Sequence, residues 1–385
     1  MSRTSRAYDV VMGLNYYAPY VSGLTDAARL VAEELAATGR RVLVVACRHD
    51  RRLPRRETIN GVDVVRTSVV ARIGKGLISP GFIPELVRHG RRAGVVNLHL
   101  PMIESGPVAR LLGRTPTVLT YQCDIALPRG AVNRLQQVVM DASNRMAFRA
   151  SDAIVPSSED YAMSSRLRDL MTPGKTTPIS PPTRLRSGGE PTFRRSNGPH
   201  VGFLGRIVEE KGVEYLVRAF RRIGDPDARL LIGGGFANVA GGSVIDVVRE
   251  AMGDDPRIEL LGFVPDDAID DFYASIDVFA LPSVNSFEAF GIVQVEAMRC
   301  GVAALSSDLP GVREPVRITG FGRIAAPRDV EAIERGLREL LSSPPDPVAG
   351  AALASATYST ERTVAEYSEL FVRTRDRARE SSRRS

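Results

Sequence analysis

The stretch HVGFLGRIVEEKGVEYLVRAF, residues 200–220, predicts a strand, a short loop and a helix in direct succession. Its apolar run at 200–205 is typical of a buried strand, and the apolar residues from Val213 onward recur at helical spacing. This succession indicates one unit of a parallel sheet that is covered by helices. Short apolar runs predict further strands on both sides of it, at residues 8–14, 41–47, 62–67, 95–100, 117–121, 152–158, 229–235, 258–263, 277–282 and 302–307.

Two series of such units are separated by residues 172–200, which are dense in Pro, Gly and Ser and predict a linker. The chain has 385 residues, more than the roughly 250–300 at which a single hydrophobic core stops growing. We therefore predict an α/β fold of two doubly wound Rossmann-like domains, 1–185 and 186–359, which face each other across a cleft. A helix over 360–376 is expected to pack back on the first domain, and residues 377–385 are expected to form a basic disordered tail.

The composition is that of an ordinary globular protein, with 43% hydrophobic and 25% charged residues. No run approaches the ~18 apolar residues of a membrane span, and the first residues are too polar for a signal peptide, so we expect a cytoplasmic protein. Three scattered cysteines support neither a disulfide framework nor a CxxC metal site. A DNA-binding role finds no helix-turn-helix, zinc site or aromatic-basic platform, so no nucleic-acid partner is expected.

Charge is distributed unevenly between the two halves. Residues 1–190 contain 27 Lys and Arg against 16 Asp and Glu, whereas the rest of the chain is slightly acidic. A basic first domain suits anionic lipid or a phosphorylated acceptor. Because residues 48–56 and 71–94 mix basic and apolar side chains, we hypothesise a weak peripheral contact with the inner membrane leaflet or a lipid-linked acceptor. The alternative is an ordinary amphipathic helix packed on the sheet.

Two cations follow the predicted strand at 200–205. Arg206 lies at its carboxyl end, and Lys211 opens the next helix. Only three of the 51 basic residues are lysine, so a lysine at this place is conspicuous. A guanidinium fork and a compact ammonium that reach the same point above a sheet suit a diphosphate. The alternative is a surface pair with Glu209 or Glu210.

A second motif is SFEAFGIVQVE, residues 286–296, which places Glu288 and Glu296 eight positions apart. The pattern predicts a loop followed by a helix that starts near Gly291, whose first N–H groups can point at a phosphate. A carboxylate accepts hydrogen bonds from two vicinal hydroxyls, so the two glutamates suit a sugar and a ribose. The alternative is that Glu288 caps the helix and Glu296 is a solvated helical residue.

A third candidate is the loop after the first predicted strand. Ser22 and Gly23 precede a helix, and a small residue at a helix start leaves backbone N–H groups free to meet an anion. This signal is weak alone, because the loop contains neither GxGxxG nor a P-loop.

GRIVEEKG at the start of the second domain, the E-x7-E motif and the Gly-containing loop together resemble the retaining glycosyltransferases of family 4 (glycosyl transferases group 1), which have the GT-B fold. The resemblance covers nearly the whole chain in order. It implies that Arg206 and Lys211 bind the donor diphosphate, that Glu288 contacts the donor sugar, and that Glu296 holds the ribose. It also implies that the backbone of Ala289, Phe290, Gly291 and Ile292 cradles the phosphates.

In the first domain, Gly23 matches the last glycine of the family's Gly-Gly loop, with Ser22 in place of its neighbour. His99 in NLHLPM resembles a His-x-Pro segment, and LTYQCDI resembles a Tyr-His-x-Asp segment in which Gln122 stands where many relatives have histidine. Glutamine cannot take a proton near neutral pH, which excludes a general-base role there. His99 and Asp124 are expected on the acceptor side.

The resemblance implies a metal-independent retaining hexosyltransferase with a nucleotide-diphosphate sugar, GDP-mannose or a UDP-sugar, as donor. It needs no further cofactor, because Arg206, Lys211 and the helix start supply the positive charge that a metal would give to the leaving diphosphate. The acceptor is a lipid-linked molecule, a glycan or a small molecule. The alternatives are a sugar-nucleotide-binding protein without turnover and an epimerase on the same scaffold.

Overall fold

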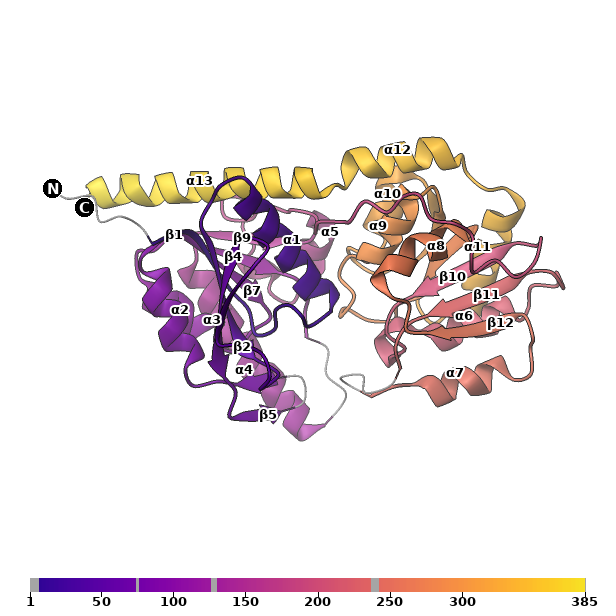
Figure 1. Cartoon of the computed structure of the whole chain (residues 1–385), viewed down its shortest axis with the longest axis horizontal. Helices are drawn as coiled ribbons and strands as arrows, with labels where there is room; N and C mark the ends of the chain where they lie inside the picture. The colour runs from indigo at the N-terminus through magenta and orange to yellow at the C-terminus, as the bar shows by residue number, and fades with distance from the viewer. Residues whose placement is uncertain (1–6, 74–75, 126–129, 237–241, 385) are drawn as a thin grey trace. The chain divides into compact units, whose positions relative to one another are not determined.

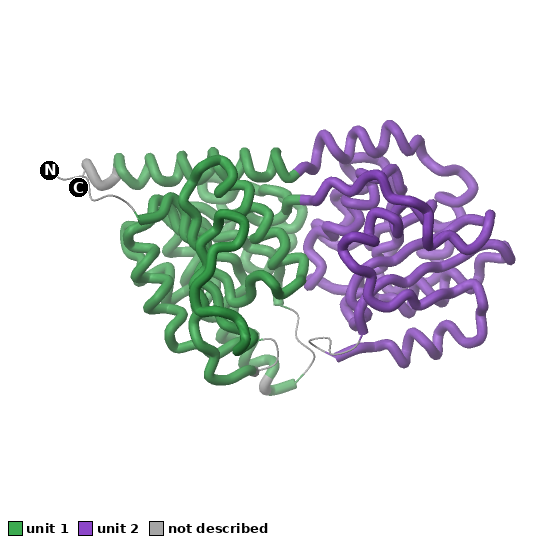
Figure 2. Tube along the Cα trace, viewed as in Figure 1, with its two compact units in different colours: residues 1–182, 360–385 green, residues 183–359 purple. Residues whose placement is uncertain are grey.

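The computed structural model describes residues 7–73, 76–125, 130–236 and 242–384. It divides into two compact units (Figure 2): unit 1 comprises residues 1–182 and 360–385, and unit 2 comprises residues 183–359. The division thus falls at 182/183, where the sequence analysis places it at 185/186.

Unit 1 is built on a seven-stranded sheet in the order β3-β4-β2-β1-β7-β8-β9, parallel except for β3. The strands form at the predicted apolar runs because each run is buried on both faces of the sheet. Their bounds are β1 Tyr8–Gly13, β2 Val42–Arg48, β3 Arg56–Ile59, β4 Val62–Ser68, β7 Ala93–Leu100, β8 Thr117–Tyr121 and β9 Ala153–Pro156. Figure 1 shows the sheet with helices around it.

The helices of unit 1 are α1 Gly23–Ala37, α2 Phe82–Gly90, α3 Ser105–Leu112, α4 Ala131–Ala150, α5 Glu159–Ser164, the 3-10 turn η1 Arg168–Leu170, and α13 Thr360–Arg384. The sequence analysis does not predict β3 or the hairpin of β5 Ala71–Ile73 and β6 Gly76–Ile78. Both are short, and β3 is a half-exposed edge strand, so neither carries a continuous apolar run.

Helix α13 is an integral part of unit 1. Its residues Val364, Tyr367 and Phe371 belong to the same buried core as Val10 and Val44 of the central strands. The helix continues to Arg384, so the prediction of a disordered tail is wrong for residues 377–384. Arginine, glutamate and alanine are good helix formers, and ion pairs one turn apart, such as Arg379 with Asp376 at 3.6 Å, support the extension.

Unit 2 has a six-stranded, wholly parallel sheet in the order β12-β11-β10-β13-β14-β15. Its strands are β10 His200–Leu204, β11 Arg229–Gly233, β12 Ile258–Gly262, β13 Val278–Leu281, β14 Ala303–Ser307 and β15 Gly322–Ala325. Its helical elements are η2 Glu209–Lys211, α6 Val213–Phe220, α7 Ile245–Met252, η3 Asp266–Ala268, α8 Ile269–Ala274, α9 Ile292–Arg299, α10 Glu314–Thr319, α11 Val330–Ser342 and α12 Pro347–Thr357. Only β15 among these strands has no counterpart in the sequence analysis.

The predicted linker is held firmly over residues 183–199, which we name the strap. It has no regular secondary structure, but its arginines pair with acidic residues of unit 2. Arg194 lies 3.2 Å from Asp277, and Arg195 lies 2.9 Å from Glu259. A high content of Pro, Gly and Ser therefore marks an irregular segment here, and side-chain pairing fixes it to unit 2.

Among the described residues, no helix is both long enough and apolar enough to cross a membrane.

Candidate functional site

The main candidate site in unit 2 lies where the strand order reverses. Strands β10 and β13 are parallel neighbours, with Val201 opposite Val278, and the chain continues from them toward opposite edges of the sheet. In doubly wound sheets, ligands bind beyond the carboxyl ends of the strands at such a point. Arg206 and Lys211 follow β10, and Glu288 follows β13, so the two sequence motifs come from the two strands that flank the reversal.

The turn that carries Lys211 is packed directly on the chain that leaves β13. Gly212 has a left-handed backbone, with φ of 59°, and a Cβ added there would lie 2.4 Å from the carbonyl oxygen of Pro282. Only glycine permits both the backbone conformation and the close approach. The glycine therefore brings Lys211 to the segment that contains Glu288.

Glu288 is held between the lysine and the start of α9. Its carboxylate forms an ion pair with the Nζ atom of Lys211, and its Oε1 atom accepts a hydrogen bond of 3.1 Å from the N–H of Gly291. The two side chains are only 16% and 15% exposed. The structure thus brings both motifs together in one half-buried cluster of an ammonium, a carboxylate and a helix N-terminus. Glu288 also caps the helix start, which is the alternative role that the sequence analysis gave it.

Arg206 takes a different position. Its guanidinium is 42% exposed and lies 3.4 Å from Oε1 of Glu210, which is the surface pair considered as the alternative in the sequence analysis. The pair is an i,i+4 contact near the surface and contributes little to stability. Arg206 is therefore able to turn toward a ligand at small cost.

The remaining residues of the second motif contribute backbone groups and packing. Ala289 and Phe290 are buried, and the Phe290 ring packs edge-on against Tyr358 at 5.5 Å between centroids. Gly291 is left-handed, with φ of 81°, and Ile292 begins α9. This arrangement orients the first N–H groups of α9, which an α-helix leaves without partners inside the helix.

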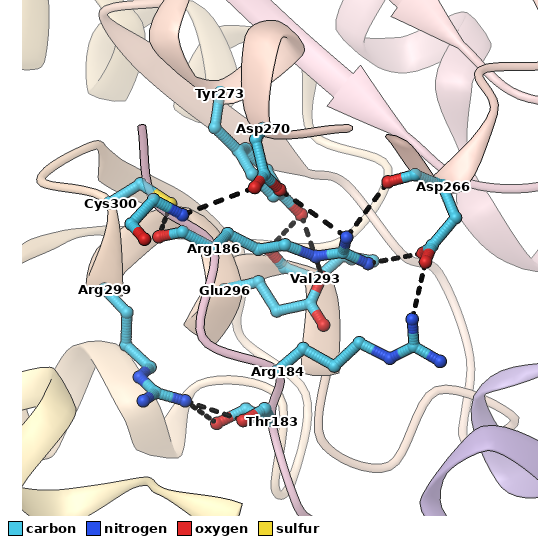
Figure 3. Close-up of polar contacts among 11 residues, drawn as sticks. Thr183, Arg184, Arg186, Asp266, Asp270, Tyr273, Val293, Glu296, Arg299 and Cys300 are labelled. Atoms are coloured by element: carbon cyan, nitrogen blue, oxygen red, sulfur yellow. Dashed lines mark hydrogen bonds and ion pairs between the residues drawn. The ribbon is translucent and has the colours of Figure 1, made fainter. Parts of the chain in front are cut away.

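Glu296 lies in a different polar cluster, which Figure 3 shows. Its carboxylate is nearly buried, 3.4 Å from the hydroxyl of Tyr273 and 3.8 Å from Nε of Arg186 in the strap. Burial and the Glu296 charge hold the pKa of the Tyr273 hydroxyl well above its ordinary value, so the hydroxyl stays protonated and donates. The alternative of a solvated Glu296 is therefore wrong.

Arg186 is the centre of this cluster. Its guanidinium lies 2.6 Å from Asp266 and 3.5 Å from Asp270 in addition to its contact with Glu296. Burial and nearby carboxylates raise the pKa of the Cys300 thiol to about 12, so Cys300 is a protonated thiol and not a nucleophile.

In unit 1, Ser22 is the N-cap of α1. Its hydroxyl accepts a hydrogen bond of 3.2 Å from the N–H of Thr25, and Gly23 is the exposed first residue of the helix. The replacement of a family glycine by serine thus has a structural role, because the side chain satisfies one of the free N–H groups at the helix start.

His99 and Gln122 contact each other at the carboxyl ends of β7 and β8. The Gln122 amide donates to Nδ1 of His99 at 3.1 Å, so the neutral ring has its proton on Nε2. That Nε2 atom is buried and has no hydrogen-bond partner among the described residues. Burial lowers the pKa of His99 to about 3, so the ring is neutral at physiological pH and offers a donor without a charge.

Asp124 has structural partners. Its carboxylate accepts hydrogen bonds from the hydroxyls of Tyr121 at 2.6 Å and Ser165 at 3.1 Å and from the backbone N–H of Arg166 at 3.3 Å. The structure therefore shows Asp124 holding two segments of unit 1 together.

Two further polar residues at strand ends were missed by the sequence analysis. Glu104 is buried near the end of β1, where its carboxylate accepts a hydrogen bond of 3.4 Å from Asn15, and burial raises its pKa. Ser283, two residues after β13, has a buried hydroxyl without a partner in the described part of the chain. In the sequence, each of these residues is a single polar residue shortly after a predicted strand. Such residues are too common for this pattern to identify a functional site.

The described part of the basic and apolar segment 71–94 packs several apolar side chains on unit 1 and leaves its basic side chains at the surface. Leu77, Phe82 and Leu86 are buried, and α2 lies against β1 and β2. The amphipathic helix of the alternative is thus present as α2, and the membrane contact stays a prediction. Within the described ranges, no group of three or more His, Cys, Asp or Glu side chains is placed to hold a metal ion.

Comparison with known proteins gives two family matches. Residues 190–352 match the model described as glycosyl transferases group 1, and residues 22–182 match the glycosyl transferase 4-like domain. The alpha-maltose-1-phosphate synthase of Mycolicibacterium smegmatis is 30% identical over 289 residues, which cover 67% of this chain and 71% of that protein.

Solved structures share the fold. The sucrose-phosphate synthase from Thermosynechococcus elongatus matches with a TM-score of 0.76 at 20% identity, covering 94% of this chain and 98% of that one. Anabaena HepE in complex with UDP and glucose matches with a TM-score of 0.69 at 16% identity, covering 95% of this chain and 99% of that one.

Proposed function

The chain belongs to the glycosyl transferases group 1 family and has the GT-B fold, and from this premise we propose that it is a retaining hexosyltransferase that uses a nucleotide-diphosphate sugar without a metal ion. The observation that carries the proposal is the cluster of Lys211, Glu288 and the Gly291 N–H at the strand reversal of unit 2. The ammonium and the helix start can bind a diphosphate. The carboxylate can accept hydrogen bonds from sugar hydroxyls.

The proposal assigns the donor as follows. Lys211 and Arg206 bind the diphosphate, together with the N–H groups at the start of α9. Glu288 accepts hydrogen bonds from the sugar, and Glu296, held by Tyr273 and Arg186, accepts from the ribose. The positive groups stabilise the charge that develops on the leaving diphosphate, which is the largest contribution that a site of this kind can make.

The chemistry that we propose needs no protein base. Gln122 cannot take a proton, and a His99 ring with a pKa of about 3 is a weak base at neutral pH. The leaving phosphate therefore receives the proton of the acceptor hydroxyl on the same face of the sugar, and the anomeric configuration is retained. His99 acts through its unpartnered Nε2–H as a neutral hydrogen-bond donor.

For the acceptor we propose a molecule that binds to unit 1, where the carboxyl ends of β1 and β7 meet. HepE, which has the same fold, holds UDP and glucose, which makes UDP a first donor nucleotide to test beside GDP. The relative from Mycolicibacterium smegmatis has a phosphorylated sugar in its name, so phosphorylated sugars are acceptors to test. We further propose that the reaction occurs in the cytoplasm and that any membrane contact is electrostatic, because Phe82 and Leu86 are buried.

The test is thermal unfolding in the presence of UDP, GDP and ADP and their common sugar conjugates. A ligand at ~100 times its dissociation constant adds about 2.7 kcal/mol of stability, which raises the melting temperature by a few degrees. We expect one nucleotide to stabilise the native chain and Lys211→Ala to lose that response. Lys175→Ala, a lysine of unit 1, is the matched control and should respond as the native chain does.

A second measurement addresses turnover. NMR of the product formed from the stabilising donor should show that the sugar keeps the anomeric configuration that it has in the donor. The rate of product formation should be the same with and without an added metal chelator. Stabilisation by a nucleotide without transfer to any acceptor would favour a binding protein, and conversion of the donor alone would favour an epimerase.

A further inference from the structure

We propose that a basic cavity in unit 1 binds a phosphate group of the acceptor; this rests on the proposed transferase function and names the acceptor's chemistry. The cavity has a volume of about 400 Å³. Its walls come from the segment that follows β2 and from the segment between β4 and β5. Its lining residues are Arg48, His49, Arg51, Ser68, Val69, Val70, Ala71 and Arg72.

The three arginines of the cavity have no carboxylate within ion-pair distance in the described part of the chain. Arg48 donates to the backbone carbonyls of Leu53 and Arg51, both at 2.5 Å, and Arg72 donates to the carbonyl of His49. Carbonyl groups fix the position of a guanidinium but leave its charge in place. The cavity therefore has an excess of about three positive charges, and two of them, on Arg48 and Arg72, are held in place by carbonyl groups.

The acidic residue of this loop does not offset that charge. Asp50 binds Arg52, whose Nη2 atom lies 2.7 Å from Oδ2 of Asp50. Burial, together with the charges of Arg66 and Arg72, lowers the pKa of His49, so the ring is neutral near pH 7. A ligand that enters the cavity thus meets arginine N–H donors beside an aromatic ring.

One aromatic ring, that of His49, lines the cavity, and two tyrosines pack against that ring. The His49 ring is 5.8 Å from the ring of Tyr16 and 5.5 Å from that of Tyr20, both from the loop after β1. Arg48 ends β2, the neighbour of β1, and Ser68 ends β4, the next strand beyond β2, so the cavity lies at the carboxyl ends of these two strands. Aromatic rings beside cationic donors suit a sugar ring that carries a phosphate.

The test uses the full chain and inorganic phosphate, then glucose 6-phosphate against glucose, titrated calorimetrically at constant ionic strength. We expect saturable binding that Arg51→Gln/Arg72→Gln weakens at least tenfold. Arg114→Gln is the matched control, because Arg114 is an exposed arginine of unit 1 that does not line the cavity, and it should bind as the native chain does. Arg51→Gln alone, at an exposed position, should weaken binding without lowering the melting temperature.

A phosphate bound by a lipid has the same chemistry. Cosedimentation with phosphatidylglycerol vesicles, against phosphatidylcholine vesicles, distinguishes that source from a soluble phosphorylated sugar. Loss of binding in the double variant in either assay supports the proposal and identifies the source.

Equal binding by the double variant and the native chain in both assays overturns the proposal. So does loss of phosphate binding in Lys211→Ala, because the phosphate would then occupy the donor site. The nucleotide titrations judge the donor site independently, so failure of the cavity and failure of the transferase assignment remain distinguishable.

Discussion

The ion pairs of unit 2 and the basic cavity of unit 1 differ in how their cations are held. In unit 2, Lys211 pairs with Glu288, and Arg186 has three carboxylates around it. In the basic cavity of unit 1, Arg48 and Arg72 are held by backbone carbonyls and retain their full charge.

The difference indicates that the charges of unit 2 contribute to stability, whereas the charges of the cavity are available to bind a ligand. A buried charge that loses its partner is costly, so paired residues of unit 2 should be sensitive to substitution. Exposed arginines that form no ion pair contribute little to the free energy of unfolding. Their substitution should therefore leave stability almost unchanged and affect only ligand binding. The predictions below test this contrast, beginning with the largest expected change.

Arg186→Met should destabilise the protein by about 3–5 kcal/mol, because it removes the cation beside Glu296, whose side chain is only 9% exposed, whereas Asp266 keeps its contact with Arg184. Urea unfolding followed by circular dichroism measures the change. Arg184→Met removes an arginine whose partner Asp266 is exposed, and it should cost less than about 1 kcal/mol. Equal effects of the two substitutions would show that burial does not decide the outcome.

Gly212→Ala should cost about 2–3 kcal/mol and weaken nucleotide binding, since a Cβ meets the Pro282 carbonyl in a left-handed turn. The same unfolding and titration experiments apply. Gly224→Ala is the control, because a Cβ there has no atom within 4 Å and the residue needs no left-handed backbone. A harmless Gly212→Ala would mean that the turn does not position Lys211.

Lys211→Met and Glu288→Gln should be coupled by about 1–2 kcal/mol in a double-mutant cycle of stability, because each leaves the other's charge half-buried and alone. The double variant should regain part of the stability but none of the nucleotide binding. Additive effects of the two substitutions would indicate that the ion pair is absent in solution.

Acidification should weaken the fold through His99. The folded pKa of about 3 lies below the unfolded value near 6.5, so below pH 6.5 the unfolded state binds a proton that the folded state does not. Stability that is present above pH 6.5 is therefore lost as the pH falls, by about 1 kcal/mol between pH 6.5 and 5.5. His99→Gln should remove this part of the loss, measured as the difference between the two proteins' unfolding free energies at each pH. An unchanged pH dependence in His99→Gln would exclude the buried neutral ring.

Much of the fold could be predicted from the sequence. The parallel strands other than β15 were predicted because burial on both faces demands continuous apolar runs, as at 42–48 and 278–281. The edge strand β3, the hairpin β5–β6 and the helical end of α13 were not, because they are stabilised by pairing or by local ion pairs and not by an apolar run. The strap was predicted as a linker because of its Pro, Gly and Ser content. Its composition does not reveal that its arginines bind acidic residues about 80 positions later in the chain.

The sequence by itself determined the residue types of the candidate site in unit 2 and their place after two strands, because the spacing of GRIVEEKG and E-x7-E follows from the strand–loop–helix units that carry them. Only the tertiary structure decided which of these residues meet. It joined Lys211 to Glu288, placed Glu296 beside Arg186 and gathered three arginines around the basic cavity. The physical reason is that ion pairs act over a few ångströms, and the order of strands in a sheet, which the local sequence does not encode, sets those distances.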